Sequence, residues 1–547
     1  MAAGAASSKY YLATFGCQMN VYDSNLIASM LERNGLSESK RVSEAQVVIV
    51  NTCSVRGGAE DRAYARIAAM RHFKKNNPDL KIAVVGCMAQ NHKEKIPMTL
   101  EHVDFVVGPD HYSELENLLF PQATPREVLT GGRVSSHSPV LSNKALPTNS
   151  AQSNPVPSLK NPSSQSHPQE NTDTDLVYTS HQTLPTPPNT PAQKAPGTQQ
   201  QKSTSEPLFY QLDQDLLDHS PYANSSTSKK RKAIPVLTTP NDTENYIGQK
   251  ARLDSSYSAF VAIMRGCNKK CSYCIVPFVR GKERSRPYLE ILQEVQEAVN
   301  LGIPEVTLLG QTVNSYRIPH QINFAGLLQN LQQVEGLARI RYTSPHPRHF
   351  TPGVIDIMAG LSKVCPHIHL PLQSGSDKIL KSMRRQYTRA QYLSIINNLR
   401  QAIPGIAITT DIITGYPGES LDDFQSTLSL VEEIQFDAAF MFSYSPREGT
   451  EACNFKETLT AEEKAHRLQT LINLQQPITF AKTDFWVGKT VEVLLEGPSE
   501  RNPDEWMGKT PHFKKVILPY TENLRPGQIV TVLLNKCKGL TLFGVPL

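Results

Sequence analysis

The sequence contains no apolar run long enough to cross a membrane. A membrane-spanning helix requires about 18 or more consecutive apolar residues, and no stretch approaches that length. The first residues also lack the apolar core of a signal peptide and the Arg-rich, amphipathic pattern of a presequence. We therefore expect a protein without a membrane partner that works in the cytosol, or in mitochondria by means of a targeting segment that this chain does not include.

The number of cysteines and the net charge of the chain are both modest. Nine Cys in 547 residues are too few for a disulfide scaffold, and six of them fall into two chemically sensible triplets. Free thiols grouped in this way indicate a reducing compartment. The net charge of +5 is mildly basic, so it is compatible with a nucleic-acid partner but does not predict one.

Residues 125–250 have too few apolar side chains to form a core. Between Pro139 and Pro240 there are 15 Pro and four aromatic residues, and Ser, Thr, Gln and Asn fill most of the rest. Such a segment cannot bury enough apolar surface to offset the entropy that ordering costs. We predict a disordered insertion here, with globular parts at 8–124 and 251–547.

Three thiols lie within eight residues in a CxxxCxxC segment formed by Cys267, Cys271 and Cys274. Three close thiolates are a soft ligand set that suits an iron–sulfur cluster or zinc. A structural zinc site requires four ligands, and the next His and Cys along the chain are only His320 and Cys365. On a four-iron cluster, three cysteines would leave one iron open to a substrate or cofactor. A cramped zinc site and unrelated structural thiols remain as alternatives.

Three further cysteines, Cys17, Cys53 and Cys87, each end a short strand-like run. The runs cover 10–16, 46–52 and 81–86, and helix-compatible stretches cover 23–34 and 56–76. The intervals between these cysteines, 36 and 34 residues, are close to one strand–helix–strand unit. Strands that alternate with helices predict a parallel sheet, so all three thiols would meet at its carboxyl edge, where α/β sheets bind ligands. We predict a second cluster there, and the alternative is three unrelated buried cysteines.

Residues 251–483 predict six β–α units. Strand-like runs cover 259–265, 305–309, 339–343, 366–370, 406–413 and 437–444, and helical stretches cover 287–301, 323–335, 351–361, 376–382, 388–402, 420–434 and 460–482. Repeated units of this kind form a parallel sheet with crossover helices. Six units are too few for a closed eight-stranded barrel, so we predict an open partial barrel whose chemistry lies in the loops after the strands.

The final residues, 484–547, alternate short strands with turns. The strands cover 491–495, 516–518, 529–534 and 540–544, which predicts a small antiparallel β-barrel. From Trp486 onward, eight Lys and Arg accompany six Asp and Glu, so composition alone does not name an RNA-binding module. The predicted fold class is therefore α/β, with an N-terminal parallel α/β domain, a partial (βα)6 barrel and a C-terminal β-barrel.

Several segments resemble one family. They are Thr14–Asn20, Asn51–Arg56 and Val85–Gln90 around the first three cysteines, the CxxxCxxC segment, and Glu496–Ser499 with Trp506–Thr510 near the end. These segments are similar to the N-terminal domain, the radical S-adenosylmethionine (SAM) core and the RNA-binding TRAM domain of the radical SAM methylthiotransferases. The resemblance covers about 8–124 and 251–547. It is greatest to the MiaB-like branch, which acts on N(6)-isopentenyladenosine in tRNA.

The resemblance implies two 4Fe-4S clusters and SAM as cofactors, and the cofactors rather than a side chain supply the reactivity. Cys267, Cys271 and Cys274 would hold the cluster that cleaves SAM to a 5′-deoxyadenosyl radical. The cluster on the other three cysteines would provide the sulfur. The partners would be a tRNA anticodon stem-loop and an electron donor such as a flavodoxin or ferredoxin system, and the protein would be a monomer. Two alternatives stay open: methylthiolation of threonylcarbamoyladenosine in tRNA, and a non-enzymatic regulator that binds a kinase or RNA through the insertion.

SAM needs hydrogen-bonding groups for its carboxylate, ribose and adenine, and the loops after the predicted strands carry them. The cofactor-binding candidates are Gln311, Asn314, Ser344, Gln373, Ser374, Gly415, Glu419 and Arg447. Gly415 allows close approach of the backbone to a ligand. These loops also resemble their counterparts in the family, except at Glu448, where relatives often carry Pro.

Basic residues crowd both sides of the CxxxCxxC segment. Seven of the 22 residues from 265 to 286 are Lys or Arg: Arg265, Lys269, Lys270, Arg280, Lys282, Arg284 and Arg286. We predict a phosphate-facing rim, with a solvated surface cluster as the alternative. A second basic group comprises Lys378, Lys381, Arg384, Arg385 and Arg389. His367 and His369 alternate along a predicted strand, and we interpret them as structural.

Overall fold

The computed structural model describes residues 8–55, 57–121 and 234–547, all of which belong to one unit of contacting elements. The predicted disorder of 125–233 therefore falls outside the described residues. None of the helices in the described part is long and apolar enough to span a bilayer.

The N-terminal domain contains a parallel sheet of six strands in the order β2-β1-β3-β4-β5-β6. They are β1 (Lys9–Thr14), β2 (Ser37–Glu38), β3 (Val47–Thr52), β4 (Lys81–Gly86), β5 (Phe105–Val107) and β6 (Val236–Leu237). Every residue of β3 is buried, as expected for a β-branched run that is covered on both faces of a parallel sheet. The predicted parallel α/β domain is thus confirmed.

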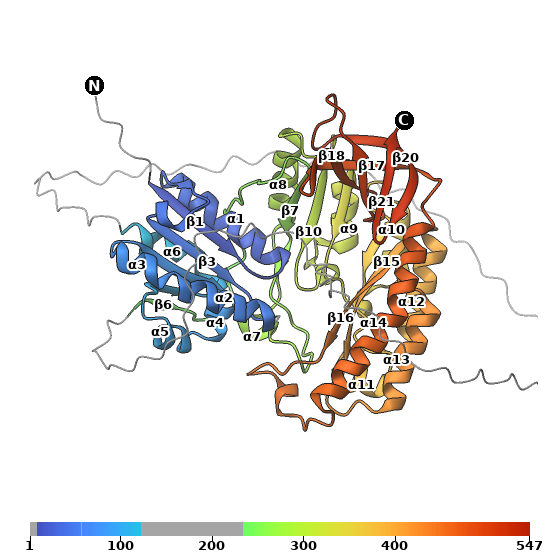
Figure 1. Ribbon diagram of the computed structural model, residues 1–547, viewed down its shortest axis with the longest axis horizontal. Coiled ribbons are helices and arrows are strands. Elements are labelled where there is room, and N and C mark those ends of the chain that lie inside the picture. The colour runs from blue at the N-terminus through green and yellow to red at the C-terminus, as the bar shows by residue number, and fades with distance from the viewer. Residues whose placement is uncertain (1–7, 56, 122–233) are drawn as a thin grey trace, which may run out of the picture. The chain divides into compact units, whose positions relative to one another are not determined.

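Helices cover both faces of this sheet (Figure 1). One face packs on α1 (Gln18–Arg33) and α6 (Tyr112–Leu119), and the other packs mainly on α2 (Gly57–Ala69) and α4 (Cys87–Asn91). The two faces draw on alternate residues of β3: Val47 and Ile49 on one side, Val48 and Val50 on the other. The remaining helices here are α3 (Arg71–Asn76) and α5 (Lys95–Thr99).

The prediction is wrong for residues 234–250, which it assigned to the insertion. Val236 and Leu237 form β6 and pair in parallel with β5. Tyr246 is fully buried and packs edge-on against Tyr22 of α1. A two-residue strand lacks a periodic pattern of its own, so the Pro-rich composition around it concealed it.

The central domain contains six parallel strands in chain order, which confirms the predicted partial barrel. They are β7 (Ser258–Ala262), β10 (Glu305–Leu309), β13 (Arg339–Tyr342), β14 (His367–His369), β15 (Ala407–Thr414) and β16 (Ala438–Ser443). Hydrogen bonding divides them into two sheets of three, and a single parallel bridge between Ile340 and Val364 connects the two.

Helices follow the strands as predicted. They are α8 (Tyr288–Asn300), α9 (Phe324–Gln332), α10 (Pro352–Ala359), α11 (Asp377–Ser382), α12 (Arg389–Ala402), α13 (Leu421–Ile434) and α14 (Ala461–Asp484). Capping boxes at Thr388, Ser420 and Thr460 begin α12, α13 and α14, because each side chain satisfies an otherwise unpaired amide of the first turn. A short hairpin, β11 (Arg317–Ile318) and β12 (Ile322–Asn323), precedes α9.

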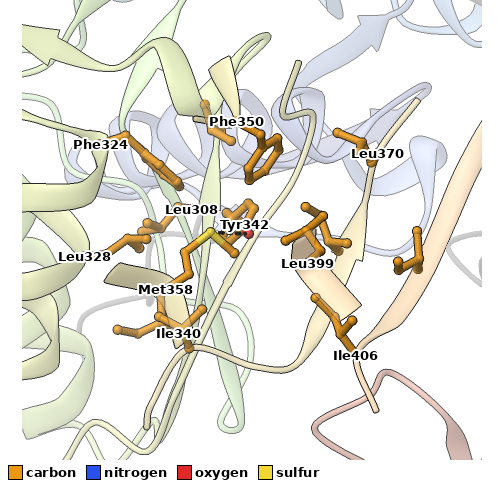
Figure 2. Close-up of a cluster of buried hydrophobic side chains, with 14 of the residues drawn as sticks. Leu308, Phe324, Leu328, Ile340, Tyr342, Phe350, Met358, Leu370, Leu399 and Ile406 are labelled. Atoms are coloured by element: carbon orange, nitrogen blue, oxygen red, sulfur yellow. Dashed lines mark hydrogen bonds between the residues drawn. The ribbon is translucent and has the colours of Figure 1, made fainter. Parts of the chain in front are cut away.

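The hydrophobic core of this domain lies between the strands and the helices outside them. Figure 2 shows Leu308 of β10 and Tyr342 of β13 facing Phe324 and Leu328 of α9. The Tyr342 hydroxyl donates to the Met358 sulfur of α10 at 3.3 Å, so this buried polar atom is satisfied within the core. Such packing fixes the strand ends, and therefore the loops that follow them.

The C-terminal domain is a closed five-stranded barrel in the order β17-β18-β19-β21-β20. The strands are β17 (Thr490–Ser499), β18 (Asn502–Lys509), β19 (Lys515–Pro519), β20 (Ile529–Lys538) and β21 (Thr541–Pro546). The predicted all-antiparallel barrel is wrong for one pair, because β19 and β21 run in parallel to close it. Arg339 and Arg341 of β13 donate to carbonyl groups of this barrel domain, including that of Lys509, and join it to the central domain.

Candidate functional site

The three N-terminal cysteines come together at the carboxyl edge of the first sheet. Cys53 and Cys87 directly follow Thr52 and Gly86, which are paired across β3 and β4. Cys17 precedes α1, and the neighbouring Gly16 has φ +121°. A Cβ on Gly16 would lie 2.5 Å from the Cys53 Cβ, so only glycine permits this approach of the two loops. The predicted convergence of strand ends is therefore present, with Cys17 exposed and the other two cysteines buried.

Two asparagines hold these strand ends together. The side-chain amide of Asn20 donates to the backbone carbonyls of Phe15 at 2.8 Å and Thr52 at 2.9 Å, which lie just before Cys17 and Cys53. The Asn51 amide donates to the Asn20 carbonyl at 2.8 Å. All these groups are buried, so the hydrogen bonds fix the loops instead of competing with water.

The CxxxCxxC loop is closed at its base by a two-stranded ribbon. The ribbon pairs β8 (Met264–Arg265) with β9 (Arg284–Ser285), and α7 (Val276–Arg280) lies within the loop. The Cys267 sulfur lies 3.5 Å from the Thr312 hydroxyl, and Arg385 donates to the Cys271 sulfur at 3.5 Å. Burial, with the nearby Cys271 second, raises the pKa of the Cys274 thiol to about 12.

The two cysteine groups meet at α7. Cys87 packs against Ile275 and Val279, and Ile275 is the residue that follows Cys274. Arg280, the last residue of α7, donates from Nε to the Cys87 sulfur at 3.3 Å. Burial raises the pKa of the Cys87 thiol, and the Arg280 guanidinium opposes that rise. The short helix α7 therefore contacts Cys87 of one group, and it begins just after Cys274 of the other group.

The donor chemistry of both groups fits iron–sulfur clusters. Each group consists of three free thiols. Iron–sulfur clusters are held by cysteine thiolates, and hydrogen bonds to their sulfurs tune them. Both groups have an arginine that donates to one sulfur. Within the described ranges, no three Cys, His, Asp or Glu side chains are arranged to hold a single metal ion.

The predicted phosphate-facing rim is wrong for most of its members. Arg265, Arg280 and Arg286 are at most 2% exposed. Arg265 and Arg284 both form ion pairs with Asp110 of the N-terminal domain, at 2.8 and 3.1 Å. These arginines hold the two domains together, and of the seven basic residues only Lys270 and Lys282 are exposed.

The second basic group is also largely engaged within the protein. Arg385 is buried beside Cys271, and Arg389 pairs with Glu433 at 3.0 Å. Lys378 pairs with Asp423 and Arg384 with Glu451, while Lys381 is exposed. His367 stacks on Phe513 of the C-terminal barrel, and His369 contacts Asp411 at 3.1 Å, as side chains with structural partners do.

Three buried polar atoms at the carboxyl ends of the central domain's strands have no hydrogen-bond partner among the residues that the structure describes. They are the side-chain oxygen of Gln311 after β10, Nε2 of His346 after β13 and the hydroxyl of Tyr444 after β16. Burial lowers the pKa of His346 to about 2, with Arg385 and Lys269 adding to the effect, so its ring is neutral. Unpaired buried polar atoms require an explanation, and a polar ligand among these loops would supply one.

Other cofactor-binding candidates have side chains that already serve the loops. The Asn314 side chain both donates to and accepts from the His346 backbone. The Ser374 hydroxyl accepts from the Ser376 amide, and Glu419 accepts from the Gly415 amide and from Arg467. These groups shape the rim, and their role in SAM binding remains a prediction.

The last four candidates differ in setting. Ser344 is exposed and, like Gln373, has a positive φ, of 56° and 70° respectively. Arg447 donates to the Val55 carbonyl of the N-terminal domain at 3.4 Å. Gly415 has φ +68°, which accounts for glycine at that turn.

Sequence reasoning missed the two arginines that contact cysteine sulfurs and the carboxylate that neutralises one of them. Arg280 and Arg385 stood out only as members of basic groups, which pointed to phosphate instead of sulfur. Asp23 is fully buried in α1 and pairs with Arg280 at 2.7 Å. The sequence did hold one indication of this pairing: Asp23 lies on the face of α1 that also carries buried apolar side chains, and a charged residue there requires a partner.

Three family models match the chain in order. They are the uncharacterized protein family UPF0004 at residues 9–108, the radical SAM superfamily at 261–431 and the TRAM domain at 485–547. The tRNA-2-methylthio-N(6)-dimethylallyladenosine synthase of Moorella thermoacetica is 37% identical over 98% of both chains. The enzyme of the same name from Carboxydothermus hydrogenoformans is 34% identical over 99% of both chains. The chain belongs to this family.

Membership in the tRNA-2-methylthio-N(6)-dimethylallyladenosine synthase family agrees with the domain order and with the six cysteines. It also implies SAM and 4Fe-4S clusters as cofactors. Solved structures are more distant. The radical SAM methyltransferase TsrM from Kitasatospora setae is 11% identical, with a TM-score of 0.47 over 80% of this chain and 73% of that one. Methylornithine synthase, PylB, has a TM-score of 0.30 at 17% identity over 40% of this chain and 63% of that one.

Proposed function

We propose that this protein is a tRNA methylthiotransferase that adds a methylthio group to C2 of N(6)-isopentenyladenosine next to the anticodon. The observation that carries the proposal is the junction at α7, where Cys87 of one cysteine group packs against Ile275, next to Cys274 of the other. Two cofactors must act on one base in this reaction, and a shared junction places them side by side. The dimethylallyl group in the relatives' names is the isopentenyl group of the predicted substrate.

The cysteines, as thiolates, would hold the two clusters, and the Gln311, His346 and Tyr444 atoms would receive polar groups of SAM. When bound, SAM and the clusters supply hydrogen abstraction, sulfur and the methyl group. The protein positions these groups and excludes water. Positioning of this kind is worth several kcal/mol, about 7 or more in well-oriented cases. Loops that are fixed by buried hydrogen bonds, such as those of Asn20 and Asn314, are suited to that task.

The substrate would be held by the C-terminal barrel together with exposed basic residues. Lys536 and Lys538 at the end of β20 are exposed, as are Lys270 and Lys282 beside the CxxxCxxC loop. Contacts of this type to phosphates position an RNA without reading its sequence. They form a smaller basic surface than the sequence predicted, so the barrel domain becomes correspondingly more important for tRNA binding.

Further aspects follow from the same proposal. A flavodoxin or ferredoxin system would donate the electrons, because a cluster of this kind requires a one-electron reductant. The protein would act as a monomer, since all six cysteines lie on one chain. A reducing compartment, the cytosol or the mitochondrion, suits its nine free thiols. The relatives' names favour the isopentenyl substrate over threonylcarbamoyladenosine, and the six-cysteine arrangement favours an enzyme over a regulator.

The substrate assignment predicts a specific loss in cells. In a strain that lacks this protein, mass spectrometry of tRNA nucleosides should show no methylthio-isopentenyladenosine and more of the unmethylthiolated precursor. Reintroducing the wild-type gene should restore the product, whereas a variant with Ala at Cys267, Cys271 and Cys274 should not. An unchanged product peak in the deletion strain would remove the isopentenyl assignment, and loss of a threonylcarbamoyl product instead would support the other substrate.

A further inference from the structure

The structure places an arginine from the SAM-cluster loop on a ligand of the other cluster. We propose that Arg280 is a positioning residue that tunes the auxiliary cluster, the one on Cys17, Cys53 and Cys87, by donating a charge-assisted hydrogen bond to the Cys87 sulfur. This inference rests on the proposed function only in assuming that both clusters assemble. It adds a role for a side chain to a reaction in which the cofactors do the chemistry.

The contact is direct and shielded from water. Arg280 Nε lies 3.3 Å from the Cys87 sulfur, within the range for a nitrogen–sulfur hydrogen bond. Both residues are about 2% exposed. In such surroundings a hydrogen bond is stronger than in water, and a nearby charge is poorly screened. Arg280 therefore acts on whatever Cys87 binds mainly through this hydrogen bond, because Asp23 offsets part of its positive charge.

The guanidinium is fixed by a second set of partners. Its terminal nitrogen donates to Asp23 at 2.7 Å and to the Asn20 side-chain oxygen at 2.8 Å. The hydroxyls of Tyr246 and Tyr112 also donate to Asp23, at 2.7 and 3.3 Å. A buried carboxylate with three donors is well satisfied, so it holds the arginine in place. An arginine is required here because its planar fork reaches Asp23 and Cys87 at once.

Through Asn20, Arg280 also connects to the other two cysteines. The Asn20 amide donates to the carbonyls of Phe15 and Thr52, which precede the loops of Cys17 and Cys53. Arg280 itself lies six residues after Cys274, on the helix that packs against Cys87. A single side chain thus joins the SAM-cluster loop to the whole edge that would carry the auxiliary cluster.

If Arg280 served only to form an ion pair with Asp23, it would not need to contact the Cys87 sulfur. Arg286 illustrates that case in the same segment. It is equally buried, and it donates to Glu294 at 2.7 Å and to Tyr22 of the N-terminal domain at 3.1 Å, with no sulfur among its hydrogen-bond partners in the described part of the chain. Hydrogen bonds and charge near cluster sulfurs shift reduction potentials, with donors favouring the more negative, reduced state. Arg280 should therefore raise the potential of the auxiliary cluster alone.

The test is a redox titration of both clusters in anaerobically reconstituted full-length protein, followed by electron paramagnetic resonance. In Arg280→Gln the auxiliary signal should shift to lower potential. At a fixed solution potential its ratio of reduced to oxidised cluster should fall about tenfold, which corresponds to about 1.4 kcal/mol, the order of one hydrogen bond to a charged group. The SAM-cluster signal should stay in place. Arg280→Lys, which keeps the charge but loses the fork, should give a smaller shift.

Three further variants control the test, and the first protects it against a loss of folding. Asp23→Asn with Arg280→Gln removes the buried carboxylate together with the cation, so the local charge is unchanged and only the hydrogen bond is lost. It should show an auxiliary shift in the same direction as Arg280→Gln, but smaller, in a stable protein. Arg286→Gln removes a buried arginine that contacts no sulfur, and its auxiliary potential should match wild type. Arg385→Gln, which loses the contact to Cys271, should instead move the SAM-cluster signal.

The inference is overturned if the auxiliary potential in Arg280→Gln equals that of wild type, or if Arg286→Gln shifts it equally. These readings need no tRNA, so they are independent of substrate. If Arg280→Gln shows the shift but the wild-type protein forms no methylthio product, the proposed function alone is contradicted. A wild-type protein that formed product, with no shift in the variant, would contradict this inference alone.

Discussion

Replacing Cys271 with alanine is expected to abolish both methylthio product and SAM cleavage. Under the proposed function, Cys271 would help to hold the cluster that binds SAM, and we expect that a loop with only two of its three cysteines would lose that cluster. The loss should exceed the roughly 100-fold that a supporting residue costs, and product should fall below detection. The measurement is an anaerobic assay with SAM and isopentenylated tRNA that quantifies 5′-deoxyadenosine and methylthiolated nucleoside separately.

The matched variant for that experiment is Cys53→Ala in the other cysteine group. It should also form no methylthio product, but it should still cleave SAM, because the CxxxCxxC loop and its contacts to Thr312 and Arg385 are intact. Cys537→Ala, in the C-terminal barrel, should behave as wild type, since Cys537 belongs to neither group. Equal SAM cleavage in Cys271→Ala and Cys53→Ala would contradict the division of labour between the two groups.

The second large effect concerns stability. Replacing Asp110 with alanine should lower the free energy of unfolding by about 3–5 kcal/mol, because it removes one partner of a buried ion pair. Asp110 pairs with Arg265, which has no exposed surface, and with Arg284. The Asp110 carboxylate also accepts a hydrogen bond from the backbone N–H of Asn241 at 3.1 Å. Chemical denaturation of the cluster-free protein, followed by circular dichroism, measures the change.

Asp242→Ala is the control for this prediction. Asp242 pairs with Lys282 of the same basic segment, but the Lys282 side chain is 76% exposed, and exposed pairs contribute little. Its denaturation midpoint should be indistinguishable from that of wild type. Equal midpoints for Asp110→Ala and Asp242→Ala would show that the buried arginines do not join the domains in the way that the structure indicates.

The strands and helices were predictable because their signals are local. The β-branched run that ends at Thr52 and the capping residues Thr388 and Ser420 act on neighbours within a few positions. The family, the two cysteine groups and the partial barrel were predictable for a similar reason, since spacing along the chain carries them. The short strand β6 and the parallel pairing of β19 with β21 depend on distant partners, and no local pattern announces either.

The charged residues show most clearly where sequence reasoning ends. The density of Lys and Arg around Arg265 and Arg280 indicates a solvent-facing rim when it is considered alone. The carboxylates that pair with these arginines, those of Asp110 and Asp23, lie about 150 or more positions earlier, in another domain. A buried arginine requires a carboxylate close by. That pairing is visible only once the two domains are in contact.

The SAM-binding candidates divide in a similar way. Polar loop residues after the strands were easy to nominate, because a partial barrel places its chemistry there. Which of them remain available for a ligand depends on hydrogen bonds between loops. Asn314 and Glu419 already have partners, whereas Gln311 retains an unpaired buried oxygen.

The central claim is that each group of three cysteines holds its own cluster, and the iron content of reconstituted protein tests it most directly. After anaerobic reconstitution, wild type should contain about eight irons per chain, with as many sulfides, as two four-iron clusters require. Replacing Cys17, Cys53 and Cys87 together by alanine should leave about four, and replacing the other three cysteines should also leave about four. Unchanged iron in either triple variant would contradict the claim.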